Sequence, residues 1–403
     1  MFRLLKLRVR LDFLINPFYL FCIAFALAIT LYLWRWSSIF PPLSFGLILF
    51  LILSFLLFIS AGLKFANRVS INSMQSLNLI FFKTYLSDYI FYLIIGLGMV
   101  NVLGMGYLPV LERTNDYREF GIPVLDPIFN SLSIFFSVFY LQLFLGSKKK
   151  KFLIFTFIIL LFQILIFRRS TLVWILASSI FLFILYRQRI KIILILVVVL
   201  CLPILSYSFG LYGNNRSNLS KNYVLNDLGA SSTFIGTGLS HNHYMTYLYV
   251  SSPLANLQKN IDEGEKFINN GDFKDFFFYC LLPASITMRL EQRFNLEPPL
   301  CSLITPDLIV GTIFMVSFYT LGWLGMSLMT LFLLGFIILS MLLVQRFDLF
   351  KLTSISILST AVALSIFTNF LNRLDVVIML FIYPVIFHFI YEKRTVHKTS
   401  IAR

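Results

Sequence analysis

Long apolar runs are the feature that most constrains how this chain can fold. They repeatedly reach the roughly 20 residues that a helix needs to cross the hydrocarbon core of a bilayer. Hydrophobic residues make up 59% of the chain and charged residues 13%, a balance that is too apolar for a soluble domain. The sequence therefore predicts an all-α polytopic membrane protein.

The apolar runs predict about ten spanning helices, of which the fifth and sixth are short and closely joined. They lie near residues 14–34, 41–62, 86–106, 124–145, 152–167, 171–186, 192–209, 318–343, 352–370 and 376–391. A long polar interruption, residues 207–311, separates the seventh helix from the eighth. The predicted organisation is thus seven N-terminal helices (1–209), a large loop containing short helices (210–311) and three C-terminal helices (312–403).

The formal net charge of +15 would suit a nucleic-acid-binding protein, but the positions of the charges favour another explanation. If both termini lie in the cytoplasm, the cytoplasmic segments hold 20 of the 33 basic residues and very few acidic ones. Such enrichment is typical of cytoplasmic loops. We therefore expect no nucleic-acid partner. Residues 207–311 should face the outside of the membrane, and loops held by a rigid scaffold often carry function.

Two arginines, Arg168 and Arg169, lie in the very short outer turn between the fifth and sixth helices. Ionisable groups at membrane depth are costly, so they indicate a functional site by default. The alternative is that both side chains extend to the interface and act only as anchors.

Other arginines are expected at the same outer boundary. Arg289 and Arg293 are four residues apart on a predicted helix, so they could form a fork for a phosphate or carboxylate, or could meet lipid headgroups. Arg373 lies in a short outer turn with Asp375 nearby, and Arg216 lies in an Asn-rich stretch predicted to be coil. An anionic group at interface depth, such as a polyprenyl diphosphate, would suit these arginines.

The run HYMTYLYVSSPLANLQKNI, residues 243–261, predicts a short helix at the membrane surface that is interrupted at its Ser-Ser-Pro sequence. Its tyrosines, Tyr244, Tyr247 and Tyr249, are candidates to stack on sugar rings, although aromatic residues at headgroup level are an equally ordinary explanation.

The sequence gives no sign of a metal centre or a cofactor. Its four cysteines have no metal-ligand spacing. Cys280 and Cys301 could form a disulfide if exported, or could be isolated small residues beside apolar patches.

Several stretches resemble a known family. The paired arginines opening RRSTLVWIL (168–176), the HYMTYLYVSSPLANL run (243–257), YTLGWLG (319–325) and the large late outer loop are similar to the Wzy-type O-antigen and oligosaccharide repeat-unit polymerases. The resemblance covers most of the chain through loose motifs. It implies a GT-C-like glycosyltransferase of lipopolysaccharide biosynthesis in the bacterial inner membrane, with its active face in the periplasm.

In that family, the substrate is an undecaprenyl-diphosphate-linked oligosaccharide, which serves as both donor and acceptor. The resemblance implies that arginines bind the diphosphate without a metal, since metal-dependent relatives of the broader fold carry paired carboxylates in the first outer loop and residues 35–41 contain none. It also implies that a general base deprotonates the acceptor hydroxyl. The candidates for that base are His241, His243 and Glu291. A chain-length regulator is a candidate protein partner. The alternatives are an O-antigen ligase, with similar chemistry and another acceptor, and a non-enzymatic lipid-linked oligosaccharide flippase. For a transporter we would expect balanced halves, which the division into seven and three helices lacks.

Overall fold

The fold is that of an all-α protein with several helices suited to a membrane. The computed structural model describes residues 8–10, 12–66, 84–111, 120–217, 220–264, 272–294, 296–347, 349–387 and 389–390. Six helices in these ranges are long and apolar enough to cross a bilayer. They are α2 (Phe45–Ala66), α3 (Thr84–Met105), α4 (Leu125–Ser147), α6 (Arg169–Arg187), α7 (Ile192–Ser217) and α12 (Met315–Val344).

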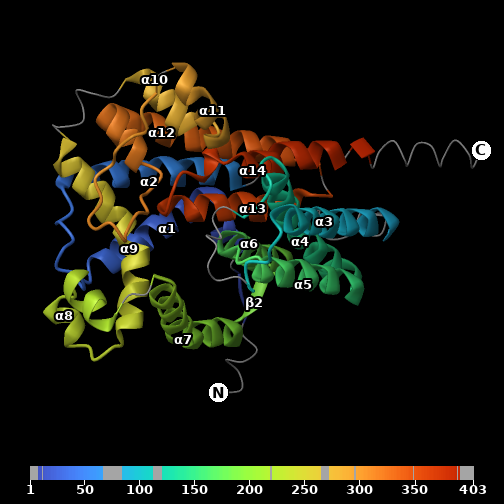
Figure 1. The fold of residues 1–403 in the computed structure, drawn as a ribbon, viewed down its shortest axis with the longest axis horizontal. Helices are drawn as coiled ribbons and strands as arrows, with labels where there is room; N and C mark the ends of the chain where they lie inside the picture. The colour runs from blue at the N-terminus through green and yellow to red at the C-terminus, as the bar shows by residue number, and fades with distance from the viewer. Residues whose placement is uncertain are drawn as a thin grey trace, which may run out of the picture.

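Shorter helices occupy the remaining predicted spans. They are α1 (Pro17–Tyr32), α5 (Lys150–Leu165), α13 (Lys351–Ala363) with its 3-10 extension η7 (Leu364–Ile366), and α14 (Leu374–Val377), which continues into the π-helical η9 (Ile378–Ile382). Figure 1 shows most of the helices lying side by side along its horizontal axis. The structure confirms the helical membrane class, while the total of ten spans and the GT-C-like fold stay predictions.

The fifth and sixth predicted helices are indeed short and closely joined. α5 ends at Leu165 and α6 begins at Arg169. Phe167 in the turn has a φ of 57°, in the left-handed region that side chains other than glycine rarely adopt. This tight turn holds Arg168 and Arg169 directly at the helix ends.

α4 is the central helix of the bundle. Most of its residues are buried, and it packs against α3, α5, α6 and α13. Polar side chains join these inner helices: Gln142 accepts a hydrogen bond from the Thr353 hydroxyl at 2.7 Å, and Ser178 and Thr360 share one at 2.8 Å. Interhelical hydrogen bonds of this kind hold membrane helices together where the hydrophobic effect is weak.

Contacts between distant segments agree with the predicted sidedness. Strand β1 (Arg8–Arg10) pairs antiparallel with β2 (Arg189–Lys191), so two basic segments predicted to share one side do lie together. Likewise, the backbone N–H of Ser38 donates to the carbonyl of Gly229 at 2.8 Å. The first outer loop and the large loop therefore share a side, and the assignment of that side to the periplasm stays a prediction.

α7 extends further than the sequence indicates. Residues up to Ser217 are helical, so the predicted coil from residue 210 begins eight residues too early. The described side chains of α7 are mostly exposed, and its main contact is with α9. Gly210 makes that contact possible, because a Cβ there would lie 1.8 Å from the carbonyl oxygen of Asn242.

α9 (His241–Asp262) corrects the predicted short surface helix. It is a continuous helix of 22 residues that passes through Pro253, and most of its residues are buried against α1, α7 and α12. Proline removes one helix hydrogen bond, but the burial of both flanks keeps the helix continuous. The Ser-Ser-Pro sequence therefore does not end the helix.

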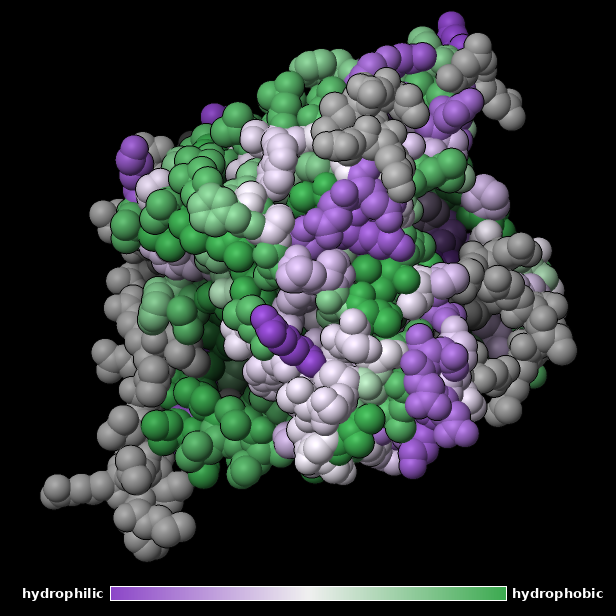
Figure 2. Space-filling view, turned by 90° about the vertical axis from the view of Figure 1, so that its left-hand side faces the viewer, coloured by the Kyte–Doolittle hydropathy of each residue, from purple (hydrophilic) through white to green (hydrophobic). Residues whose placement is uncertain are grey.

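The rest of the large loop is built from short elements. These are the π-helical η4 (Tyr223–Asp227), α8 (Ser232–Ile235), α10 (Phe273–Phe276), the π-helical η6 (Phe277–Leu281) and α11 (Ala284–Phe294). α8 and α9 lie at the left of Figure 1, and α10 and α11 lie along α12 at its top. Figure 2 faces the left-hand side, where hydrophilic patches alternate with hydrophobic areas.

The close contact of α7 with α9 at Gly210 gives a first prediction. Gly210→Ala should force α7 away from α9 and lower the melting temperature of the purified protein, because overpacking costs about 1–3 kcal/mol. Gly335→Ala in α12 is the matched control, since a Cβ there meets nothing within 4 Å. Thermal unfolding in detergent, followed by size-exclusion chromatography, measures both variants. Equal melting temperatures would show that the two helices do not depend on close contact at Gly210.

Candidate functional site

Arg168 forms an ion pair with the first turn of α4. One terminal nitrogen of its guanidinium, Nη2, lies 2.5 Å from Asp126 Oδ1, and the side chains of both residues are only 17% exposed. The same nitrogen donates to the carbonyl of Phe120 at 2.7 Å. Arg168 therefore ties the turn between α5 and α6 to the segment that enters α4.

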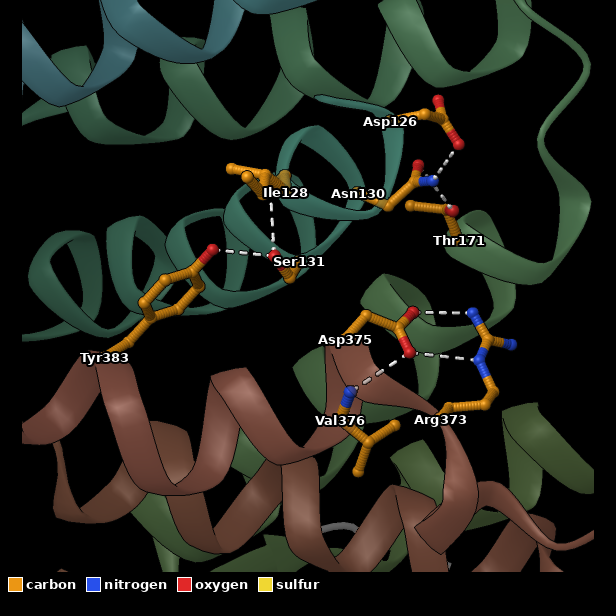
Figure 3. Close-up of polar contacts among 9 residues, drawn as sticks. All are labelled: Asp126, Ile128, Asn130, Ser131, Thr171, Arg373, Asp375, Val376 and Tyr383. Carbon is orange, nitrogen blue, oxygen red and sulfur yellow. Dashed lines mark hydrogen bonds and ion pairs between the residues drawn. The ribbon is translucent and has the colours of Figure 1, made fainter. Parts of the chain in front are cut away.

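Further polar groups continue this contact into the bundle. Asn130 donates to Asp126 Oδ2 at 3.2 Å, and Thr171 of α6 donates to the amide oxygen of Asn130 at 3.4 Å (Figure 3). The carboxylate, the amide and the hydroxyl thus link the beginnings of α4 and α6.

A second arginine pair lies at the beginning of α14. Arg373 Nη2 and Nε donate to the two carboxylate oxygens of Asp375 at 2.6 and 3.1 Å, the bidentate geometry that Arg and carboxylate favour. The guanidinium also lies 5.6 Å from the centre of the Phe370 ring. Figure 3 shows this pair in the same view as Asp126, and α14 packs against α4.

These pairs change the interpretation of the arginines. The sequence predicts that an anion holds Arg168 at membrane depth, and the structure provides one within the chain, the carboxylate of Asp126. Arg373 is held by Asp375 in the same way. A phosphate could bind each arginine beside its carboxylate partner or in place of it. The two ion pairs are therefore compatible with a structural anchor and with a phosphate-binding site.

The other predicted arginines lie elsewhere or outside the described side chains. Arg289 and Arg293 are exposed and lie four residues apart on α11, which confirms that they share a helix. The structure does not bring them into the cluster around Asp126. The side chains of Arg169 and Arg216 lie outside the described residues.

A cavity of about 1160 Å³ reaches the first turn of α6 and the residues just before Arg373. Its walls come from α6, α7, α9, η6, the chain before α12 and the turn between η7 and η8 (Phe370–Asn372). Most of the lining is apolar, including Leu202 and Phe209 of α7. Ser170 and Asn372, which also line it, directly follow Arg169 and directly precede Arg373. The apolar space of the cavity therefore extends to residues that are next to Arg169 and Arg373 in the sequence.

His243 reaches this cavity through a hydroxyl. Its ring nitrogen Nδ1 lies 3.2 Å from the hydroxyl oxygen of Ser206, a residue of α7 that lines the cavity. Tyr207 contacts the same imidazole in a T-shaped arrangement at 5.7 Å. A proton released in the cavity could therefore pass through Ser206 to His243.

The other two candidate bases have different surroundings. Burial, and then the positive charge of Lys221, lower the pKa of His241. Glu291 is half-buried on α11 near Tyr279, which lines the cavity. Burial, and then the negative charges of Glu291 and Asp275, raise the pKa of Tyr279 to about 12. Of the two histidines, only His243 hydrogen-bonds a described residue of the cavity wall, while Glu291 interacts with Tyr279.

The three candidate sugar-binding tyrosines separate into two environments. Tyr244 is fully buried, and its hydroxyl donates to the carbonyl of Leu228 at 2.7 Å. Tyr247 is 3% exposed and packs 5.2 Å from Trp36. These two rings belong to the core of the large loop and expose almost no surface on which a sugar could stack. Tyr249 is half-buried and lines the cavity, so it remains a candidate.

Two asparagines of α9 form contacts that the sequence analysis missed. Asn256 donates to the carbonyls of Leu308 and Val310 and accepts from the N–H of Ile304, while Asn260 makes similar bonds to Ser302. Their side-chain amides therefore supply the backbone hydrogen bonds that a neighbouring strand would otherwise give to the irregular chain before α12. Their spacing of four residues would have placed them on one helix face, a usable signal for such a role.

No group of three or more His, Cys, Asp or Glu side chains is placed to hold a metal ion within the described ranges. Cys280 is buried and Cys301 half-buried, and both are free thiols.

No family model, curated protein or solved structure matches the chain. The interpretation of the site therefore rests on its own geometry.

Proposed function

We propose that the protein is an inner-membrane glycosyltransferase that polymerises undecaprenyl-diphosphate-linked repeat units into a surface polysaccharide. The observation that carries the proposal is the mostly apolar cavity of about 1160 Å³ with Ser170 and Asn372 in its lining, each next to an arginine in the sequence. A lipid-linked diphosphate has a long apolar chain and an anionic head. The chain matches the apolar lining of the cavity, and the head matches the neighbouring arginines. The sequence resemblance to the Wzy-type polymerases supports the same assignment.

In the proposed reaction, a hydroxyl of the acceptor sugar attacks the anomeric carbon of the donor glycan. The bond from that carbon to the diphosphate oxygen breaks, and its electron pair leaves with the diphosphate. Arg168 and Arg373 would stabilise this negative charge, a role for preorganised cations. The hydroxyl proton would pass through Ser206 to His243, which acts as the general base.

Deletion of the gene from its host tests the function by the glycan that accumulates. A polymerase predicts that surface glycan shrinks to one repeat unit while lipid-linked units are still exported. Gel analysis of surface polysaccharide, together with mass spectrometry of lipid-linked glycan, distinguishes the alternatives. Long lipid-linked chains without surface glycan would instead identify a ligase, and units retained on the cytoplasmic side would identify a flippase.

The absence of a metal requirement is a second prediction. If arginines neutralise the diphosphate, polymerisation by the purified protein should proceed at an unchanged rate in excess chelator. The assay measures the length of glycan made from lipid-linked repeat units in vesicles, with and without added magnesium. Loss of polymer in chelator, with recovery on adding magnesium or manganese, would contradict the metal-free mechanism.

A further inference from the structure

The side chain of Trp174 on α6 is 1% exposed, and its indole nitrogen Nε1 has no hydrogen-bond partner among the described residues. Trp174 nevertheless lines the cavity. A buried donor without a partner is unusual, because removing such a group from water carries a free-energy penalty that a hydrogen bond normally offsets.

Aromatic contacts hold the indole beside an arginine. Trp174 meets Phe370 in a T-shaped arrangement with ring centres 5.3 Å apart, and Arg373 lies over the same phenyl ring. Phe370 lines the cavity and contacts both the indole and the guanidinium, although Arg373 itself is not among the lining residues. Ser170, one helical turn before Trp174, also lines the cavity.

We propose that Trp174 donates its indole N–H to a phosphate oxygen of a polyprenyl diphosphate bound in the cavity. This role rests on the proposed function, since it specifies how that cavity holds the head of its lipid substrate. An indole offers a donor and no acceptor, so it suits a group that only accepts. Hydrogen bonds to charged groups are the stronger kind, and losing one weakens binding by about ten- to a hundredfold.

Trp174→Phe is the direct test, because phenylalanine keeps an aromatic ring against Phe370 and lacks the N–H. The probe is farnesyl diphosphate, and farnesol, which has the same chain without phosphate, is its control. Titration of the purified full-length protein should show farnesyl diphosphate binding about ten- to a hundredfold more weakly to the variant. Binding of farnesol should be the same in both proteins.

Trp323→Phe is the matched control for loss of an indole. Trp323 is 39% exposed on α12 and does not line the cavity. This variant should bind both probes like the wild type. A Trp174→Phe protein that is folded and binds farnesyl diphosphate as tightly as the wild type would overturn the role of Trp174 and leave the proposed function standing. A wild type that binds neither probe would overturn the proposed donor itself.

A measurement on the wild type covers the case in which Trp174→Phe does not fold. The chain has four tryptophans, so indole-¹⁵N labelling gives four N–H signals at most. Substituting Trp34, Trp36 and Trp323 in turn assigns the Trp174 signal by elimination. That signal should move downfield when farnesyl diphosphate is added and stay in place with farnesol. An unmoved signal at saturating diphosphate would overturn the inference.

Discussion

Replacing Arg168 by alanine should shorten the surface glycan to a single repeat unit and also destabilise the protein. The two effects have different origins, because the guanidinium would stabilise the leaving diphosphate and is also the ion-pair partner of Asp126 at 2.5 Å. Removing one partner of a buried pair leaves an uncompensated charge and costs about 3–5 kcal/mol. We expect about 3 kcal/mol, the lower end of that range, since both side chains remain 17% exposed.

A double-mutant cycle separates the structural role of Arg168 from binding of a diphosphate. If Arg168 is only an anchor, Asp126→Ala should harm the protein as much as Arg168→Ala, and the double variant should recover both stability and polymer length. If Arg168 binds diphosphate, Asp126→Ala should keep polymer activity, whereas the double variant should lack it. Thermal unfolding and glycan gels, read at matched protein levels, measure the two properties separately.

Two further variants sharpen the test. Arg168→Lys keeps the charge and loses the planar fork, so it should restore chain length only in part. Lys151 pairs with Asp88 where α3 and α5 begin, so Lys151→Ala is a control for losing an ion pair. It should leave glycan length unchanged. Full-length chains from stable Arg168→Ala protein would mean that the diphosphate is held by other groups.

The positions of Arg168 and Arg373 could be predicted from the sequence, but their partners could not. Two apolar runs separated by a few residues fix a tight turn, so the depth of Arg168 follows from spacing alone. Asp126 opens a different helix, and only the packing of α4 beside α6 brings its carboxylate within reach. Arg373 and Asp375 are two residues apart, so that partner was visible in the chain.

The large loop was harder to predict because its short elements depend on distant partners. The spacing of Tyr244 and Tyr247 is the same for a helix on the membrane surface and for one buried against Trp36. The sequence offers no sign that the first outer loop covers these rings. For α9, proline and two serines suggest an interruption locally, but packing on α1, α7 and α12 outweighs one missing hydrogen bond. Tertiary burial thus determines where Tyr244 and Tyr247 lie and keeps α9 continuous.

Tertiary contacts also distinguish the two histidines, which the sequence does not rank as candidate bases. His241 and His243 differ by two residues on α9, so they point to different sides of the helix. Only His243 lies within hydrogen-bond distance of a side chain that lines the cavity, the hydroxyl of Ser206 at 3.2 Å. The choice therefore depends on how α7 crosses α9, which no local pattern encodes.

His243→Ala should consequently lower the polymerisation rate by about a hundred- to ten-thousandfold, the usual contribution of general acid–base catalysis. Binding of farnesyl diphosphate should be unchanged, because the imidazole acts on the acceptor and not on the diphosphate. Ser206→Ala should cause a smaller loss, since a water molecule can replace a relaying hydroxyl. Single-turnover rates with lipid-linked repeat units, measured alongside probe binding, separate catalysis from affinity.

His241→Ala and Glu291→Gln identify the base if this assignment is wrong. With His243 as the base, both variants should polymerise within a fewfold of the wild-type rate, because the proton passes through Ser206 to His243 and to neither of these side chains. A hundredfold loss in Glu291→Gln, with an active His243→Ala, would move the base to α11 and the proton path to Tyr279. The two outcomes place the acceptor sugar beside Ser206 or beside Tyr279, so the same rates also locate the acceptor.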